Sequence, residues 1–194
     1  MIDSPQTRVG MSLADFLREQ ADAPFELIDG EKLPKIPTAF MHSLVLKKLF
    51  LLLVAYEQAH KTIVTLYETT FAQTESPDWV KGSHIPDLMV YQAETIAAFM
   101  SSEEALQNRP INVVPDLCVE VVSPTDRFSE VERKVSRYFE DGVQAVWVID
   151  PEEKLVFAYQ AGSNQVQRLT GDNELVEPNL LPEFTARVGD LFPA

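Results

Sequence analysis

Two acidic residues lie inside stretches that are otherwise apolar and rich in β-forming residues. Asp87 is part of HIPDLMVYQ and Glu120 is part of PDLCVEVVS, and both stretches have the composition of strands. A carboxylate among apolar neighbours is costly unless it is paired or bound to a cation. If the two strands are neighbours, the acids could share a divalent metal, and oxygen ligands suit Mg²⁺ or Mn²⁺. The alternative is a pair of edge-strand acids that face solvent or bond to nearby arginines.

A third acid, Asp116, precedes Glu120 in the same stretch. Side chains alternate between the faces of a strand. One face therefore carries Asp116, Cys118, Glu120 and Val122, and the other carries Leu117, Val119 and Val121. Asp116 is about 13 Å from Glu120 along an extended strand, so both acids could hardly ligate one ion. Because Asp116 directly follows Pro115, we expect it to mark the start of the strand.

A lysine after the second stretch could act at the same site. Residues 129–142 predict a helix that Ser129 caps and Gly142 ends. Its core stripe consists of Val131, Val135, Tyr138 and Phe139. Lys134 falls at the margin of this stripe, about 40° from Tyr138 around the helix. There it could offset charge on a phosphate or position a water. Alternatively, it lays its apolar stem on the core and keeps its ammonium group in water.

The rest of the chain supplies the elements that must position these residues. The expected order is a helix capped by Ser12, a hairpin turning at Asp29-Gly30, a long helix at 38–61, strands at 62–73, 84–92 and 115–123, the helix at 129–142, and strands at 143–150, 154–160 and 166–170. A turn is expected at 76–83, and a short helix within the connection near 94–107. This order predicts an α/β fold with helices around a mixed sheet, not a βαβ repeat.

Composition limits the classes of protein that this chain can belong to. It has 194 residues, which fits one domain, and 45% of them are hydrophobic, enough for a core without disulfides. The single cysteine, Cys118, excludes an internal disulfide and a cysteine-based zinc site, and it favours a reducing compartment. We find neither a signal peptide nor an apolar run that could span a bilayer, so we expect a cytoplasmic protein without a membrane partner.

The charge of the chain bears on its partners. The formal net charge is -14, which argues against a broad electrostatic grip on nucleic acid, because such binding draws on Lys and Arg contacts to phosphates. A local basic patch on an acidic protein is still compatible with nucleic-acid binding.

Six stretches, taken in order, resemble the Uma-two family. They are FELIDGE, MHSLVLKKL, IPDLMVY, PDLCVEVVSPTDR, ERKVSRYFEDGVQAVWVIDPEEK and VGDLF, and the resemblance runs from about Met11 to Phe192. That family is a bacterial set of proposed restriction endonucleases within the PD-(D/E)XK nuclease superfamily. The resemblance implies a restriction-endonuclease-like core in a single domain at 1–194. We expect the core at about 38–160, an N-terminal helix and hairpin at 11–37, and C-terminal strands at 161–194.

The resemblance also assigns roles to individual residues. In the superfamily an Asp on the second core strand and a Glu on the third bind the metal, which here are Asp87 and Glu120. The usual third member is a lysine two residues after the Glu, where this sequence has Val122. Related families supply the lysine from the following helix, and Lys134 matches that position.

Further acids could complete such a site. The superfamily often adds one from the first core helix, where this sequence offers His42 near the start and Glu57 near the end. His42 also fits a core or capping histidine. Glu26 and Glu31, in the hairpin, match acids of the family, and the alternative for both is a solvated hairpin acid.

The function implied by the resemblance is a Mg²⁺-dependent endonuclease that hydrolyses phosphodiester bonds of DNA. Many superfamily members cut as dimers, which implies a homodimer here. The net charge and Val122 favour one alternative, a catalytically inactive binding or regulatory module on a nuclease scaffold. A second alternative, a hydrolase of small phosphorylated molecules, would explain the acidity of the chain.

Overall fold

The computed structural model of the protein describes residues 8–35, 39–123 and 126–193. The chain divides into two compact units. The first contains Met1–Ile36, Thr70–Ile85 and Phe99–Val113, and the second contains Pro37–Thr69, Pro86–Ala98 and Val114–Ala194. The single domain expected from the sequence stays a prediction, and the expected start of its core at residue 38 lies outside the described residues.

The first unit begins with the two local features that the sequence predicts most clearly. Helix α1 (Leu13–Asp22) is capped by Ser12, whose hydroxyl accepts a hydrogen bond from the backbone N–H of Asp15 at 3.1 Å. Strands β2 (Phe25–Ile28) and β3 (Glu31–Pro34) form the expected hairpin. Asp29 and Gly30 have φ angles of 51° and 85°, as a two-residue turn requires. Both predictions are confirmed.

The expected strand at 62–73 is instead two strands in different sheets. Strand β4 (Ile63–Tyr67) belongs to the second unit and β5 (Phe71–Ser76) to the first. Between them Glu68 has a φ of 44°, which breaks the extended chain. The expected turn at 76–83 is also wrong, because Trp79–His84 forms strand β6, which pairs with β5. The residues on both sides of the break favour strands, so the sequence predicts one continuous strand there.

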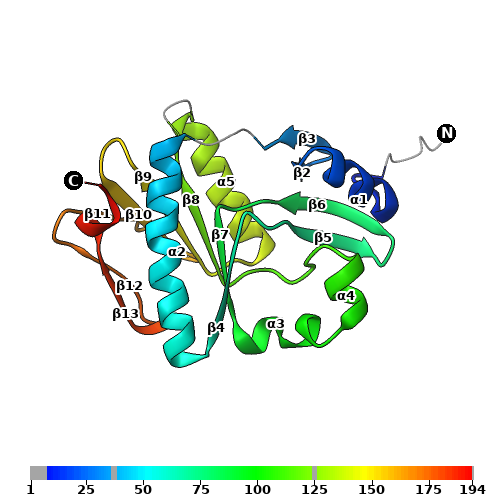
Figure 1. Ribbon diagram of the computed structural model, residues 1–194. Coiled ribbons are helices and arrows are strands. Elements are labelled where there is room, and N and C mark those ends of the chain that lie inside the picture. Colours follow the sequence, from blue (N-terminus) through cyan, green and yellow to red (C-terminus); the bar gives the residue numbers. More distant parts are fainter. Residues whose placement is uncertain (1–7, 36–38, 124–125, 194) are drawn as a thin grey trace. The chain divides into compact units, whose positions relative to one another are not determined.

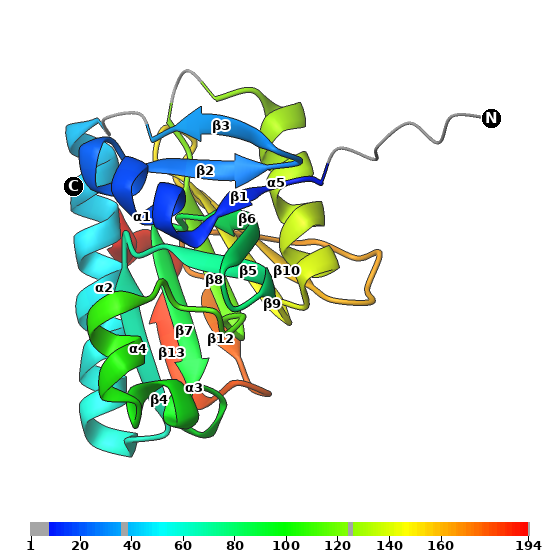
Figure 2. The same ribbon diagram turned by 90° about the vertical axis from the view of Figure 1, so that its right-hand side faces the viewer.

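These strands build the sheet of the first unit (Figure 2). Its order is β1-β6-β2-β3, with β1 at Met11–Ser12 and with β5 on β6. Its apolar core contains Phe16, Phe25, Leu27, Ala72 and Val80. The expected helix near 94–107 is two helices, α3 (Ala93–Met100) and α4 (Glu103–Asn108).

The second unit is built on a sheet in the order β11-β10-β9-β8-β7-β4. Its further strands are β7 (Leu88–Gln92), β8 (Leu117–Val121), β9 (Ala145–Asp150), β10 (Leu155–Gln160) and β11 (Gln167–Thr170). Strands β8 and β9 are parallel and the other pairs are antiparallel, so the sheet is mixed as expected. Helix α5 (Phe128–Asp141) connects the two parallel strands.

Helices cover both faces of this sheet (Figure 1). Helix α2 (Phe40–His60) lies on one face, where Val45, Leu49 and Leu53 pack into a core with the apolar side chains of β8. The C-terminal hairpin of β12 (Glu174–Glu177) and β13 (Leu181–Arg187), followed by η1 (Val188–Leu191), shares this core. Helix α5 lies on the other face. The predicted α/β class, with helices around a mixed sheet, is confirmed.

The ends of α5 agree only in part with the sequence. The helix ends at Gly142, which has a φ of 105°, as predicted. It begins one residue before Ser129, so Ser129 lies inside the first turn and is not the cap. Arg127 occupies the cap position, and its backbone N–H donates to the Glu130 carboxylate at 3.4 Å. Across residues 8–35, 39–123 and 126–193, none of the helices combines the length and apolarity that crossing a membrane requires.

A buried acid in the C-terminal hairpin leads to a prediction about stability. Glu177 is 1% exposed, and burial raises the pKa of its carboxyl above the ordinary value. The Gln160 amide donates to Oε2, and hydrogen bonding from Gln160 and from the backbone of Asn179 lowers the pKa by less than burial raises it. Folding therefore favours the protonated acid. The stability that protonation contributes is complete below the unfolded-state pKa and is lost as the pH rises through the folded-state pKa.

We expect Glu177→Gln, which stays uncharged, to gain stability over the unaltered protein as the pH rises from about 4 to about 8. Thermal unfolding of both proteins across this range gives the measurement. A difference in Tm that does not change with pH would contradict the prediction.

Candidate active site

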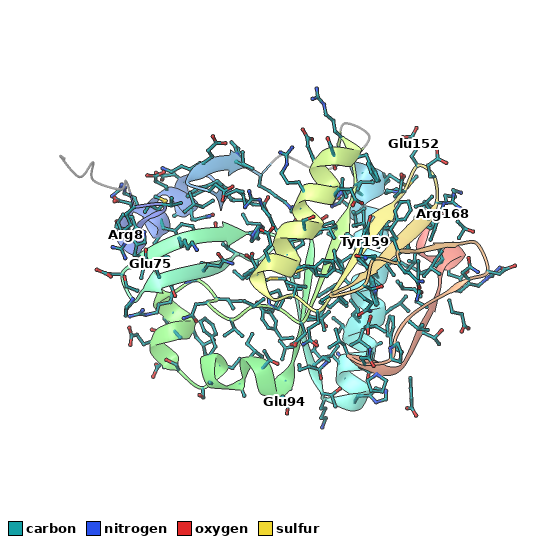
Figure 3. All side chains as sticks on the ribbon, turned by 180° about the vertical axis from the view of Figure 1, so that it is seen from behind. Arg8, Glu75, Glu94, Glu152, Tyr159 and Arg168 are labelled. Carbon is teal, nitrogen blue, oxygen red and sulfur yellow. The ribbon has the colours of Figure 1, made fainter. Side chains whose placement is uncertain are left out.

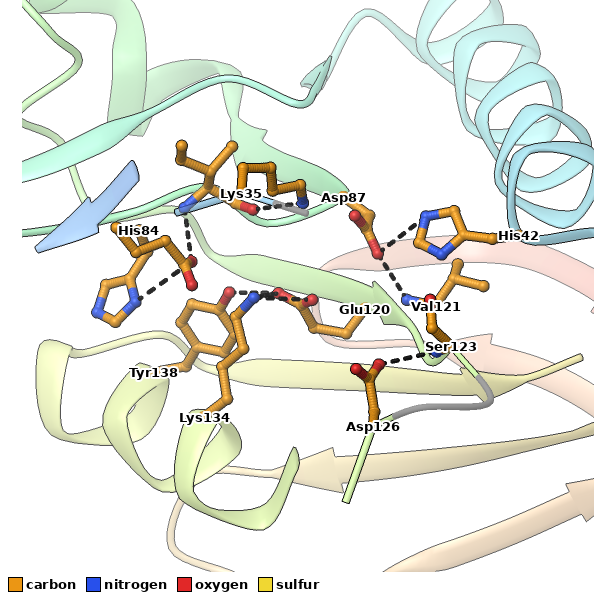
Figure 4. Close-up of polar contacts among 12 residues, drawn as sticks. Lys35, His42, His84, Asp87, Glu120, Val121, Ser123, Asp126, Lys134 and Tyr138 are labelled. Carbon is orange, nitrogen blue, oxygen red and sulfur yellow. Dashed lines mark hydrogen bonds and ion pairs between the residues drawn. The ribbon is translucent and has the colours of Figure 1, made fainter. Parts of the chain in front are cut away.

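Asp87 lies directly before β7 and not inside a strand as expected. Strands β7 and β8 are antiparallel with Leu88 opposite Val119, which brings Asp87 beside the C-terminal half of β8. The carboxylate is 2% exposed, and its Oδ2 accepts a hydrogen bond from the backbone N–H of Val121 at 2.8 Å (Figure 4). This bond fixes Asp87 against the strand that carries Glu120.

Glu120 lies within β8, on the face that α5 covers. Both of its carboxylate oxygens lie 3.0 Å from Nζ of Lys134, and the Tyr138 hydroxyl donates a hydrogen bond to Oε1 (Figure 4). Lys134 therefore reaches from the helix margin to the sheet, and it is not a lysine that only covers the core. The buried carboxylate is compensated by an ion pair and a neutral donor from one helix.

His42 lies in the first turn of α2. Its side chain is 4% exposed, and its Nε2 lies 3.4 Å from Oδ2 of Asp87, which makes an ion pair when the imidazole is protonated. Within the part of the chain that the structure describes, neither ring nitrogen makes a hydrogen bond. The second unit thus brings four of the sequence-predicted site residues into one group: His42, Asp87, Glu120 and Lys134.

The other acids considered from the sequence have different surroundings. Glu31 belongs to the first unit, where it is exposed on β3. Glu26 accepts a hydrogen bond from the backbone N–H of Ile85 at 2.8 Å, within the same unit. Glu57, near the far end of α2 from His42, accepts from the backbone N–H of Thr65 at 2.8 Å and joins the helix to β4. Glu57 therefore has a structural role within the second unit. The site roles that the sequence gives to Glu26 and Glu31 stay predictions.

Asp116 has the structural role that the sequence favours. It directly precedes β8, and its two oxygens accept hydrogen bonds from the backbone N–H of Gln92 at 2.7 Å and from the Gln144 side chain at 2.6 Å. These bonds hold the start of β8 to the end of β7 and to the segment before β9. Asp116 is as buried as a metal ligand would be, but its hydrogen bonds to Gln92 and Gln144 explain why a carboxylate is tolerated at this position.

The donor atoms of the group allow a test of which metal would fit. Across the described ranges, no group of three or more His, Cys, Asp or Glu side chains is arranged to hold a metal ion. This excludes, within those ranges, the closed set of four ligands typical of structural zinc. Mg²⁺ is commonly held by one or two carboxylates and keeps several waters. The buried oxygens of Asp87 and Glu120 fit that requirement.

Comparison with known families now identifies the kind of protein that carries this group. A family model described as "Putative restriction endonuclease" matches residues 13–189. The chain belongs to the Uma2 family. This match confirms the resemblance to the Uma-two family that the six stretches of the sequence show.

Solved structures support the same fold for this Uma2 protein. A crystal structure from Anabaena variabilis, described as "a putative nuclease belonging to DUF820", superposes with a TM-score of 0.75. The two chains are 20% identical, and the match covers 93% of this chain and 97% of the other. At this identity the likeness establishes the fold, which confirms the restriction-endonuclease-like class. Among curated proteins, none matches this chain.

The contact of Tyr138 with Glu120 in this Uma2 protein was not predicted from the sequence. The helical pattern placed Tyr138 in the core stripe of α5, and it is indeed fully buried. Its hydroxyl nevertheless reaches Glu120. The available signal is its spacing, because residues four apart lie on the same helix face and Tyr138 comes four residues after Lys134.

Proposed function

We propose that this Uma2 protein is a Mg²⁺-dependent endonuclease that hydrolyses phosphodiester bonds of DNA. The observation that carries the proposal is the buried carboxylate of Glu120, paired with Lys134 and adjacent to the strand that follows Asp87. Burying two carboxylates at neighbouring strands is costly for a fold alone. The family's own description supports nuclease chemistry.

Each residue of the group has a role in this proposal. Asp87 and Glu120 would hold Mg²⁺ or Mn²⁺, and the bound ion would polarise a phosphate and lower the pKa of a water. Lys134, placed at Glu120, would offset the negative charge that develops on the phosphate oxygens. The Val121 backbone N–H and the His42 ring would keep the Asp87 carboxylate in one orientation.

The acidity of the chain favours a second candidate function. With a net charge of -14, cationic contacts to DNA must be local and few, so only a small number of phosphates can be neutralised. A hydrolase of small phosphorylated molecules would need no extended cationic surface. The same carboxylates and lysine could serve that reaction, so the substrate must be decided by experiment.

Incubation of the purified protein with supercoiled plasmid tests the proposal. We expect nicked or linear DNA with Mg²⁺ or Mn²⁺ and none with EDTA. A parallel panel of nucleotides and aryl phosphate esters tests the second candidate, which predicts turnover of these and none of DNA. Turnover of neither, together with no Mn²⁺ binding by calorimetry, would contradict both and would leave a nuclease-fold binding module. Sedimentation of the same sample tests the expected homodimer.

A further inference from the structure

Tyr138 is the more rigid of the two partners that α5 gives to Glu120. Its side chain is fully buried, and its phenol is oriented by two torsion angles inside the packed layer between helix and sheet. Lys134 reaches the same carboxylate through a flexible four-carbon chain, and its side chain is 26% exposed. The fixed donor, rather than the flexible cation, therefore determines how the Glu120 carboxylate is turned.

We propose that Tyr138 is a positioning residue of the site, whose hydroxyl holds the Glu120 carboxylate in the orientation that binds metal and meets Lys134. This inference rests on the proposed function. Glutamate has three side-chain torsions, and the hydrogen bond from Tyr138 to Oε1 fixes the last of them. Groups that orient a metal ligand commonly change metal affinity or activity 10–100-fold when they are removed.

Helix geometry explains why one element can supply both groups. Lys134 and Tyr138 are four residues apart, so they lie one above the other on the face of α5 that points to β8. Val122, two residues after Glu120, carries no side-chain donor. The helix therefore contributes the charge and the fixed hydrogen bond that this strand lacks.

The chain offers a closely matched control for this inference. Tyr159 lies on β10 (Figure 3) and is also buried. Its hydroxyl donates to Oε1 of Glu132, another α5 carboxylate, at 2.6 Å. Burial and the neighbouring Glu132 raise the pKa of Tyr159, so this donor keeps its proton. Tyr159→Phe thus removes the same atom and the same kind of helix–sheet hydrogen bond without touching Glu120.

The orientation of Glu120 is tested first, without metal or substrate. In protein labelled with ¹³C at glutamate carboxyl carbons, the Glu120 signal is assigned through its loss in Glu120→Gln. We expect Tyr138→Phe to shift or broaden this signal and Tyr159→Phe to leave it unchanged. An unaltered Glu120 signal in Tyr138→Phe would overturn the inference.

Metal binding and cleavage are measured next on the same proteins. We expect Tyr138→Phe to weaken Mn²⁺ binding about 10-fold by calorimetry and to lower kcat at saturating metal while the KM for DNA is retained. Tyr159→Phe should keep both values even if it lowers Tm. Equal losses in the two variants would show a merely structural role and overturn the inference. If the unaltered protein neither binds Mn²⁺ nor cuts DNA, the proposed function fails, while a shifted Glu120 signal still supports positioning by Tyr138.

Discussion

We expect Glu120→Gln to abolish the proposed metal-dependent cleavage of DNA, with a rate at least about 10³-fold below that of the unaltered protein. The amide keeps the size of the side chain and can still accept a hydrogen bond from Tyr138. It loses the negative charge that a divalent ion requires, so Mn²⁺ binding measured by calorimetry should be lost together with activity. Plasmid nicking under single-turnover conditions gives the rate.

The control for this change is Asp116→Asn. It makes the same acid-to-amide replacement at a buried residue next to the same strand. Because Asp116 accepts its hydrogen bonds from Gln92 and Gln144, we expect a loss of stability of about 1–3 kcal/mol and unchanged Mn²⁺ affinity. Activity that survives in Glu120→Gln, or Mn²⁺ binding lost equally in both variants, would remove Glu120 from the site.

Lys134→Met gives the second large effect and separates catalysis from metal binding. We expect kcat to fall about 10²–10³-fold, because the variant lacks the cation that offsets charge on the phosphate. Mn²⁺ binding should be retained or strengthened, since a positive charge 3.0 Å from the Glu120 oxygens has been removed. Titration calorimetry and single-turnover cleavage on one preparation measure both quantities.

Arg133→Met is the matched control for the lysine. Arg133 is the preceding residue of α5 and is exposed, so its replacement changes the net charge equally without altering the contacts of Glu120. We expect little change in kcat. A similar fall in both variants would mean that the general charge of the helix matters, and a weakened Mn²⁺ affinity in Lys134→Met would mean that the lysine mainly supports the fold of the site.

Much of the site could be predicted because its two main elements are regular. Alternation along β8 assigns Glu120 to one face, and the helical period places Lys134 at the margin of the buried face of α5. Both are local rules, and the contact between Glu120 and Lys134 follows once the helix packs on that face. The hairpin at Asp29-Gly30 was predictable for the same reason, because its turn depends on two adjacent residues.

The features that the sequence missed depend on backbone angles or on distant contacts. The break between β4 and β5 comes from a positive φ at Glu68. Glutamate rarely adopts a positive φ, so the sequence does not predict this break. Asp87 falls just outside β7 because pairing with β8 begins at Leu88. A helical pattern shows that Tyr138 is buried, but only the packing against β8 shows that its hydroxyl meets a carboxylate.

The division into two units constrains how this protein can be cut or recombined. The chain passes from one unit to the other at 36/37, 69/70, 85/86, 98/99 and 113/114. No single cleavage therefore yields a fragment that contains all of one unit and none of the other. Each unit must be assembled from segments far apart in the chain, which raises the average sequence separation of contacts and slows folding. Gene fusion or exchange can thus transfer the candidate site at Asp87 and Glu120 only together with the interleaved segments of the first unit.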